Sequence, residues 1–210
     1  GVGGVFKIGD TVTATWNNTA GGDNNADTIS AVTVDFSQFG GGAAVVATNS
    51  SGTWTATYPI VAGTIDATNR NVSVTAIDNA GNAATTADTT NATVDNQAPT
   101  VTDARIAISG ASGTSGAFKA GDTVTATWNN TAGGDNNADT ISAVTVDFSQ
   151  FGGGAAVAAT NSSGTWTATY LIAAGAIDTT NRNVSVTATD NAGNATTTAD
   201  TANATVDSQA

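Results

Sequence analysis

The segment Gly121–Trp128, which reads GDTVTATW, decides the fold class of this chain. Its apolar residues Val124, Ala126 and Trp128 alternate with polar ones, so an extended strand would have one apolar and one polar side. Valine and threonine also favour strands over helices. The same eight letters recur at Gly9–Trp16. The sequence therefore predicts a half-buried β-strand that the chain uses twice.

The repetition extends far beyond this strand. Residues Gly9–Gln97 recur as Gly121–Gln209 at an offset of 112 residues, with nine mismatches. A solenoid repeat has ~20–50 residues, whereas a whole domain has ~100–150. We therefore expect two tandem domains, residues 1–97 and residues 98–210. Pro99 stands at their boundary, where a short and stiff connection is expected.

Seven segments of the second copy are rich in strand formers and are bounded by Gly, Asn or Asp. They are Val101–Ser109, Asp122–Trp128, Ile141–Phe148, Ala155–Thr160, Gly164–Tyr170, Asn183–Ala188 and Thr196–Asp207. No window shows an apolar stripe with helical spacing. We predict an all-β fold made of two tandem immunoglobulin-like β-sandwich domains with about seven strands each.

The first copy has no counterpart of residues Pro99–Ser112, because Gly1 aligns with Gly113. The first domain should therefore lack its N-terminal strand. Two explanations are open at this point: the chain is cut there, or strands are exchanged between chains. The short segment Val2–Lys7 could serve as a partial substitute.

Composition excludes several classes of function. The chain has 17 acidic residues, all of them Asp, against 5 basic ones, and a net charge of −12. Nucleic acids and anionic membranes require basic patches, so neither is an expected partner. Cys, His and Met are absent, which removes thiol chemistry, zinc sites and histidine catalysis, and we expect no enzyme. No apolar run approaches the ~20 residues of a membrane span. Since the chain starts without Met, we expect a piece of a longer protein.

Two sequence motifs of the chain are similar to those of a known family. The sequence VTATDNAGN at Val186–Asn194 has the counterpart VTAIDNAGN at Val74–Asn82, and VDNQAPTVT follows at Val94–Thr102. Together they resemble the bacterial immunoglobulin-like repeats of large cell-surface adhesins. The resemblance implies extender modules that hold a distal binding domain away from the cell. It also implies an extracellular or cell-surface location, and Ca²⁺ at the junctions between modules.

The loop GGDNNADT is the first candidate for Ca²⁺. Its oxygen ligands at i, i+2 and i+4 would lie on one side of an extended loop, as in the first half of a Ca²⁺-binding loop. These candidates are Asp23, Asn25 and Asp27 in the first copy and Asp135, Asn137 and Asp139 in the second. The loop lacks the glycine and the final Glu of an EF-hand. A polar loop built from Asx turns is the alternative interpretation.

The junction between the copies is the second candidate. By the resemblance, Asp95 and Asp103 could meet Asp78 or Asp190 around a Ca²⁺ ion, with Asp207 as the counterpart of Asp95. Clustered carboxylates repel one another, and a divalent ion would relieve that repulsion. The alternative is that Asp78 and Asp190 shape tight turns through hydrogen bonds to the backbone.

These observations favour a non-catalytic extender or stalk repeat of a cell-surface or secreted adhesin-like protein, stiffened by Ca²⁺. Its partners would be neighbouring repeats of the same protein. A filament or surface-layer subunit that assembles with its own copies by strand exchange is one alternative. A multivalent glycan- or surface-binding module is another. The tryptophans fit core packing better than a sugar-stacking platform, because each lies in register with other apolar residues of its strand.

Overall fold

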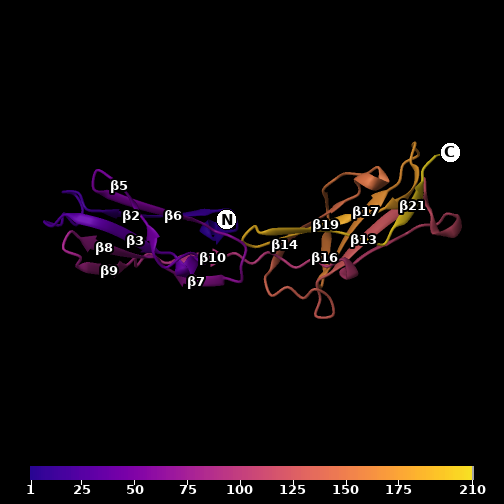
Figure 1. Cartoon of the computed structure of the whole chain (residues 1–210). Coiled ribbons are helices and arrows are strands. Elements are labelled where there is room, and N and C mark those ends of the chain that lie inside the picture. Colours follow the sequence, from indigo (N-terminus) through magenta and orange to yellow (C-terminus); the bar gives the residue numbers. More distant parts are fainter. Residues whose placement is uncertain (210) are drawn as a thin grey trace. The chain divides into compact units, whose positions relative to one another are not determined.

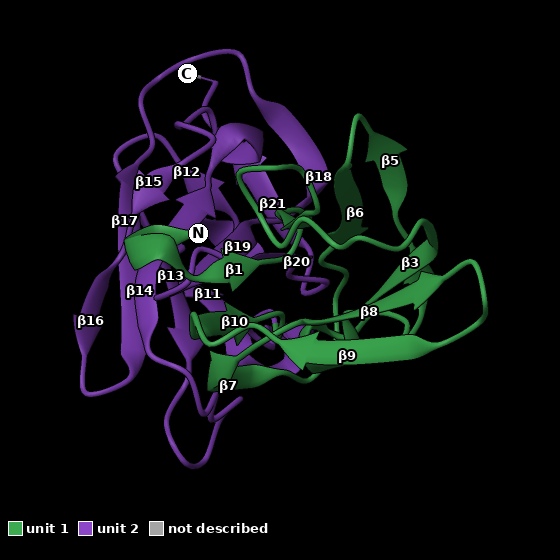
Figure 2. Ribbon diagram, turned by 90° about the vertical axis from the view of Figure 1, so that its left-hand side faces the viewer, with its two compact units in different colours: residues 1–97 green, residues 98–210 purple. Residues whose placement is uncertain are grey.

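The computed structural model describes residues 1–209. This part of the chain is all-β and contains no α-helix. It divides into two compact units, Gly1–Gln97 and Ala98–Ala210, which Figure 2 shows in different colours. No helix in the described residues is long and apolar enough to cross a membrane.

Unit 2 contains three sheets (strand labels in Figure 1). Its strands are β11 (Ile106–Ser109), β12 (Phe118–Lys119), β13 (Thr123–Asn129), β14 (Ile141–Asp147), β15 (Val157–Ala158), β16 (Thr160–Ser162), β17 (Thr165–Leu171), β18 (Asp178–Arg182), β19 (Ser185–Asp190), β20 (Ala195–Ala199) and β21 (Ala204–Asp207). The two larger sheets have the orders β11-β13-β17-β16 and β15-β14-β19-β20. The third has the order β12-β21-β18, and its strands β12 and β21 run parallel.

Unit 1 repeats this arrangement with one strand fewer. Its strands are β1 (Phe6–Lys7), β2 (Thr11–Asn17), β3 (Ile29–Asp35), β4 (Val45–Val46), β5 (Thr48–Ser50), β6 (Thr53–Pro59), β7 (Asp66–Arg70), β8 (Ser73–Asp78), β9 (Ala83–Ala87) and β10 (Ala92–Asp95). The sheets have the orders β2-β6-β5, β4-β3-β8-β9 and β1-β10-β7. Strand β2 therefore lies at an edge, whereas its counterpart β13 pairs on both sides.

Short 3-10 turns lie before or between some of the strands. They are η1 (Val2–Gly4), η2 (Ser37–Phe39), η3 (Asp103–Arg105), η4 (Thr114–Gly116) and η5 (Ser149–Phe151). The predicted strand Val101–Ser109 forms only from Ile106 onward, because η3 occupies the three residues before it.

The core of unit 2 confirms the alternation of apolar and polar residues predicted for Gly121–Trp128. Val124, Ala126 and Trp128 of β13 are fully buried. They belong to one hydrophobic cluster with residues of the facing sheet, such as Val144 of β14 and Val186 of β19. Alternate side chains of the two larger sheets thus fill a single core, as the period of two along each strand requires.

The expected number of about seven strands for each domain is wrong, because several short strands lack the alternation that marks the long ones. The segment Thr196–Asp207 forms two strands in different sheets, β20 and β21. The segment Ala155–Thr160 likewise divides between β15 and β16. The suggestion that Val2–Lys7 replaces the missing strand is also wrong, since β1 pairs with β10 exactly as β12 pairs with β21.

Candidate functional site

The loop after β2 is held in a fixed conformation by hydrogen bonds within unit 1. The Nε1–H of Trp16 donates to Oδ2 of Asp23 at 2.7 Å. The backbone N–H and the side-chain amide of Asn25 both donate to Oδ1 of Asn18, at 2.8 Å and 2.7 Å. Asp27, the third predicted ligand, is exposed. This part of the loop is therefore ordered by its own polar groups.

The equivalent loop of unit 2 has additional partners. Oδ2 of Asp135 accepts from Nε1 of Trp128 at 2.7 Å and from the backbone N–H of Thr102 at 2.9 Å. The hydroxyl of Thr102 donates to Oδ1 of Asp135 at 2.6 Å. Asn137 accepts from the N–H of Thr100 at 2.6 Å and donates to its carbonyl at 2.9 Å. The loop thus fastens the first residues of unit 2 to its body, a role that the ion hypothesis did not include.

Asp78 and Asp190 shape the turns that follow β8 and β19. Oδ1 of Asp78 accepts from the backbone N–H groups of Ala80 and Asn82, each at 2.8 Å. Asp190 does the same for the residues after it, including Gly193 at 2.7 Å. The side-chain amide of Asn82 also bonds to Asp78 and, with the backbone bonds, holds the pKa of Asp78 below its usual range. These hydrogen bonds are the ones expected if Asp78 and Asp190 shape tight turns.

Asp103 connects the start of unit 2 to the loop before β21. Its two carboxylate oxygens accept from the N–H of Thr201 at 2.8 Å and from the hydroxyl of Thr201 at 2.6 Å. The hydroxyl contact is the main reason why the pKa of Asp103 is lowered. Burial raises the pKa of the neighbouring Asp200, and the charge of Asp103 adds to that effect. Asp95 belongs to unit 1 and Asp103 to unit 2, so a junctional calcium site stays a prediction.

A pair of carboxylates lies at the end of each unit. Asp95 of β10 is the register partner of Asp66 on β7, and carboxylate oxygens of the two residues lie within 4.8 Å of each other. Asp207 and Asp178 are register partners in the same way in unit 2. Two carboxylates at this separation could both ligate one divalent cation. Asp95 and Asp207 could be selected from the sequence, but their partners Asp66 and Asp178 could not, because β7 and β18 carry no alternation that would predict a strand there.

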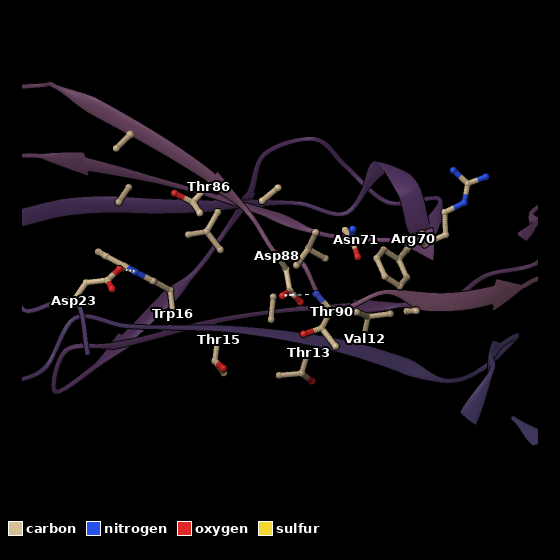
Figure 3. A pocket seen from close by; sticks show the side chains of 18 of the residues that line it. Val12, Thr13, Thr15, Trp16, Asp23, Arg70, Asn71, Thr86, Asp88 and Thr90 are labelled. Atoms are coloured by element: carbon tan, nitrogen blue, oxygen red, sulfur yellow. Dashed lines mark hydrogen bonds between the residues drawn. The ribbon is translucent and has the colours of Figure 1, made fainter. Parts of the chain in front are cut away.

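The surface between β2 and β9 of unit 1 is an open groove with a volume of about 840 Å³. It is lined by β2, β8 and β9 and by the loop residues Asp23 and Asn25. Figure 3 shows Trp16 and Asp23 toward one end and Arg70 and Asn71 toward the other. In unit 2 the residues between Val101 and Ser109 cover the equivalent surface.

The buried Asp122 gives a prediction for acid stability. The hydroxyl of Ser112 donates to it, as do backbone N–H groups of Ser112 and Lys119, and these bonds bring its pKa far below the ordinary value of 3.8. A carboxyl group whose pKa is lowered on folding stabilises the fold above its unfolded pKa, and this stabilisation is lost as the pH falls through the native pKa. Between about pH 5 and about pH 2, the stability difference between the wild type and Asp122→Asn should therefore shrink.

Hydrogen exchange of the unit 2 amides at each pH measures this difference. Asp27→Asn, which changes an exposed carboxylate of unit 1, is the matched control. A gap between wild type and Asp122→Asn that stays constant across this range would contradict the assignment of the acid response to Asp122. Asp200 has the opposite effect on the pH dependence of stability, because its pKa is raised on folding. Its negative charge destabilises the folded state, and protonation at low pH removes this destabilisation.

Comparisons with known proteins give only distant likenesses. No family model and no curated protein matches the chain. It is similar to a solved structure of the tetra-tandem repeat in the extending region of a large adhesion protein, with 22% identity and a TM-score of 0.33, over 95% of this chain and 50% of that one. It is also similar to SGBP-B of the mixed-linkage glucan utilization locus of Bacteroides ovatus, solved with a heptasaccharide, with 20% identity and a TM-score of 0.23, over 97% of this chain and 42% of that one. The chain thus spans half or less of the length of these structures.

Proposed function

We propose that this chain is a non-catalytic extender segment of a cell-surface or secreted adhesin-like protein, made of two immunoglobulin-like modules in tandem. One observation carries the proposal. In each unit a two-residue strand pairs in parallel with the last strand: Phe6 of β1 with Val94 in unit 1, and Phe118 of β12, the strand after β11, with Val206 in unit 2. The partners of the module are neighbouring repeats of the same protein.

Parallel pairing of a strand near the start of a unit with its last strand suits a module that carries tension. A pull applied just before β12 and just after β21 draws these two strands in opposite directions along their common axis; a pull on the ends of unit 2 reaches them once β11 has separated from β13. Their inter-strand hydrogen bonds are then loaded together, whereas bonds that are peeled from one end break one after another. Unit 1 has the same arrangement in β1 and β10. A mechanical role thus explains why both copies keep a two-residue strand at this position.

Force spectroscopy with two attachment geometries tests this role. The chain has no cysteine, so introduced thiols give unique handles. Thr114→Cys with Gln209→Cys places the handles so that β12 and β21 are sheared. Thr114→Cys with Ala202→Cys places both handles before the paired strands, so that the same strands are peeled apart. We expect a clearly higher unfolding force in the first geometry. Equal forces in the two geometries would count against a mechanical module.

The proposal includes Ca²⁺ at the carboxylate pairs. Asp66 with Asp95, and Asp178 with Asp207, place like charges side by side across paired strands. Such pairs repel one another, and a divalent ion removes the repulsion while its oxygen ligands are already in place. If Ca²⁺ binds only the folded units, millimolar Ca²⁺ should raise the melting temperature by about 5–10 °C relative to a chelator.

Calorimetry with and without Ca²⁺ measures this shift. The double variant Asp66→Asn and Asp178→Asn should lose the response to Ca²⁺. Asp35→Asn is the matched control, because its carboxylate accepts a hydrogen bond from the backbone of Ser37 and lies in neither pair. If chelation does not change the melting temperature of the wild type, the calcium part of the proposal is wrong. The mechanical part is then still tested by force spectroscopy.

A further inference from the structure

Two carboxylates of unit 2 lie close together, and neither is paired with a lysine or arginine in the part of the chain that the structure describes. Asp103 belongs to η3, near the start of the unit, and Asp200 follows β20, in the connection to β21. We propose that Asp103 and Asp200 together form a site for a small divalent cation, Mg²⁺. The site shares no residue with the carboxylate pairs at the ends of the units. The inference therefore does not depend on the mechanical role or on Ca²⁺.

The side chain of Asp200 is fixed in the interior of unit 2. The residue is 2% exposed. Its backbone N–H donates to the carbonyl of Val184 at 2.9 Å, and its Oδ1 accepts from the backbone N–H of Ala202 at 2.8 Å. Its second carboxylate oxygen, Oδ2, is also buried but accepts no hydrogen bond. Because a buried charged oxygen without a partner is costly in free energy, a ligand for Oδ2 is expected.

Asp103 supplies the second carboxylate of the site. Its oxygens accept from the N–H and the hydroxyl of Thr201, so the residue next to Asp200 fixes its orientation. The carboxyl groups of Asp103 and Asp200 lie within hydrogen-bonding reach of each other. Two ionised carboxylates are both acceptors, so they repel each other at this separation. A cation between them would attract both and would satisfy the free oxygen of Asp200.

The chain itself does not supply this positive charge. Among residues 1–209, the ion pairs are formed by Asp10 and Asp122, and neither involves the two carboxylates of the site. Arg105 lies two positions after Asp103, but it is exposed and forms no ion pair with it. The neighbouring Thr201 is exposed as well, so a cation from the solution can reach the site from that side.

The number of ligands and the room for them favour Mg²⁺ over Ca²⁺. Mg²⁺ is bound through one or two carboxylates and keeps several waters, whereas the larger Ca²⁺ takes about 6–8 oxygen ligands. Here two carboxylates converge, and the free oxygen of Asp200 is enclosed by the protein. Asp103 is only half-buried, so water can complete the coordination there. Histidine and cysteine are absent, which disfavours the metals that prefer nitrogen or sulfur ligands.

A cation at this position would join two segments that are distant in sequence. One is η3, which precedes β11, and the other is the connection between β20 and β21. The hydroxyl of Thr198 already donates to the carbonyl of Val101 at 2.7 Å between the same parts of the unit. The cation would therefore hold the start of unit 2 against the point where the chain passes from one sheet to the next.

Hydrogen exchange of the Thr201 and Ala202 amides tests the site directly, because these N–H groups donate to its two carboxylates. The experiment uses the whole chain with Asp66→Asn and Asp178→Asn, so that the pairs at the ends of the units cannot account for the result. We expect magnesium chloride to slow both exchanges in a saturable way. The rates should fall about ten-fold when Mg²⁺ is at about ten times its dissociation constant. Calcium chloride should have little effect on these amides.

Three variants of that chain make the test specific. Asp200→Asn should abolish the response to Mg²⁺, and Asp103→Asn should weaken Mg²⁺ binding at least about ten-fold. Without Mg²⁺, Asp200→Asn should not speed the exchange, because asparagine can still accept from Ala202 and the repulsion is removed. Asp88→Asn is the matched control: Asp88 accepts from the N–H of Thr90 at 3.0 Å but is exposed, so the response should be unchanged.

Three results would overturn the proposal. The first is exchange of both amides that does not respond to Mg²⁺; if a lower pH slows it instead, the two carboxyl groups share a proton and bind no cation. The second is a response that survives Asp200→Asn, which would place the ion elsewhere. The third is an equal response to Ca²⁺, which would contradict a site for a small ion. The force and melting experiments concern other residues, so this proposal and the mechanical one fail independently.

Discussion

Replacing Trp128 by alanine should destabilise unit 2 by about 3–5 kcal/mol, and the same change at Trp16 should cost unit 1 only about 1–2 kcal/mol. The two residues have the same place in identical strands and make the same hydrogen bond of 2.7 Å to an aspartate. They differ in burial, because only Trp128 is covered by a neighbouring strand. The larger cost follows from the larger apolar area and the cavity that the truncation leaves. Hydrogen exchange of the most protected amides in each unit gives the two free energies of unfolding.

A second pair of tryptophans provides the control. Trp54 and Trp166 are buried to the same degree, with 9% and 8% of each residue exposed, so the missing strand does not change their burial. Alanine at either position should cost its unit the same free energy. The missing strand would not explain the difference between the units if alanine lowered the free energy of unfolding equally at Trp16 and Trp128. The same conclusion would follow if it lowered that free energy unequally at Trp54 and Trp166.

Gly134→Ala should destabilise unit 2 by about 2–4 kcal/mol. A Cβ atom at this position would lie 2.1 Å from the carbonyl oxygen of Asn129, so the loop would have to move. That movement breaks the hydrogen bond from the N–H of Asp135 to the same carbonyl, at 3.1 Å. Asp135 would then lose its contacts with Trp128 and Thr102 as well. Chemical denaturation followed by tryptophan fluorescence measures the change.

The neighbouring glycine is a close control. A Cβ atom on Gly133 meets only the hydroxyl of Thr131, at 3.9 Å, so Gly133→Ala should be nearly neutral. Gly22→Ala creates the same clash in unit 1 but should cost less than Gly134→Ala, because Asp23 holds no N-terminal segment there. Equal effects of Gly133→Ala and Gly134→Ala would refute the steric argument.

The long strands could be predicted from the sequence because their burial is one-sided. In β13 the alternation of Val124, Ala126 and Trp128 with polar residues gives both the strand and its inward face. Strand β18 (DTTNR) could not be found in this way, because its residues show no apolar face. Its place in a sheet is determined by pairing with β21, a contact between residues distant in sequence.

The contacts of the polar loop residues are even harder to predict from the sequence than the short strands. The sequence marks Asp135 and Asn137 as oxygen donors at regular spacing, which is equally compatible with an ion and with hydrogen-bond donors. The deciding partners, Thr100 and Thr102, lie more than thirty positions earlier in the chain. The hydrogen bonds of Asp78 are easier to predict from the sequence, because its partners Ala80 and Asn82 follow within the same turn. Local spacing predicts local contacts, and the rest depends on the tertiary fold.

The parallel pairing of β1 with β10 and of β12 with β21 also has a consequence for how each module folds. Phe6 pairs with Val94, so the contact that closes unit 1 joins its two ends and cannot form until nearly the whole module is present. Contacts between residues so distant in sequence slow folding, because the loop must be closed before the pairing contributes any stability. The parallel pair of each unit is therefore expected to form late in folding, after the strands of the two larger sheets have paired.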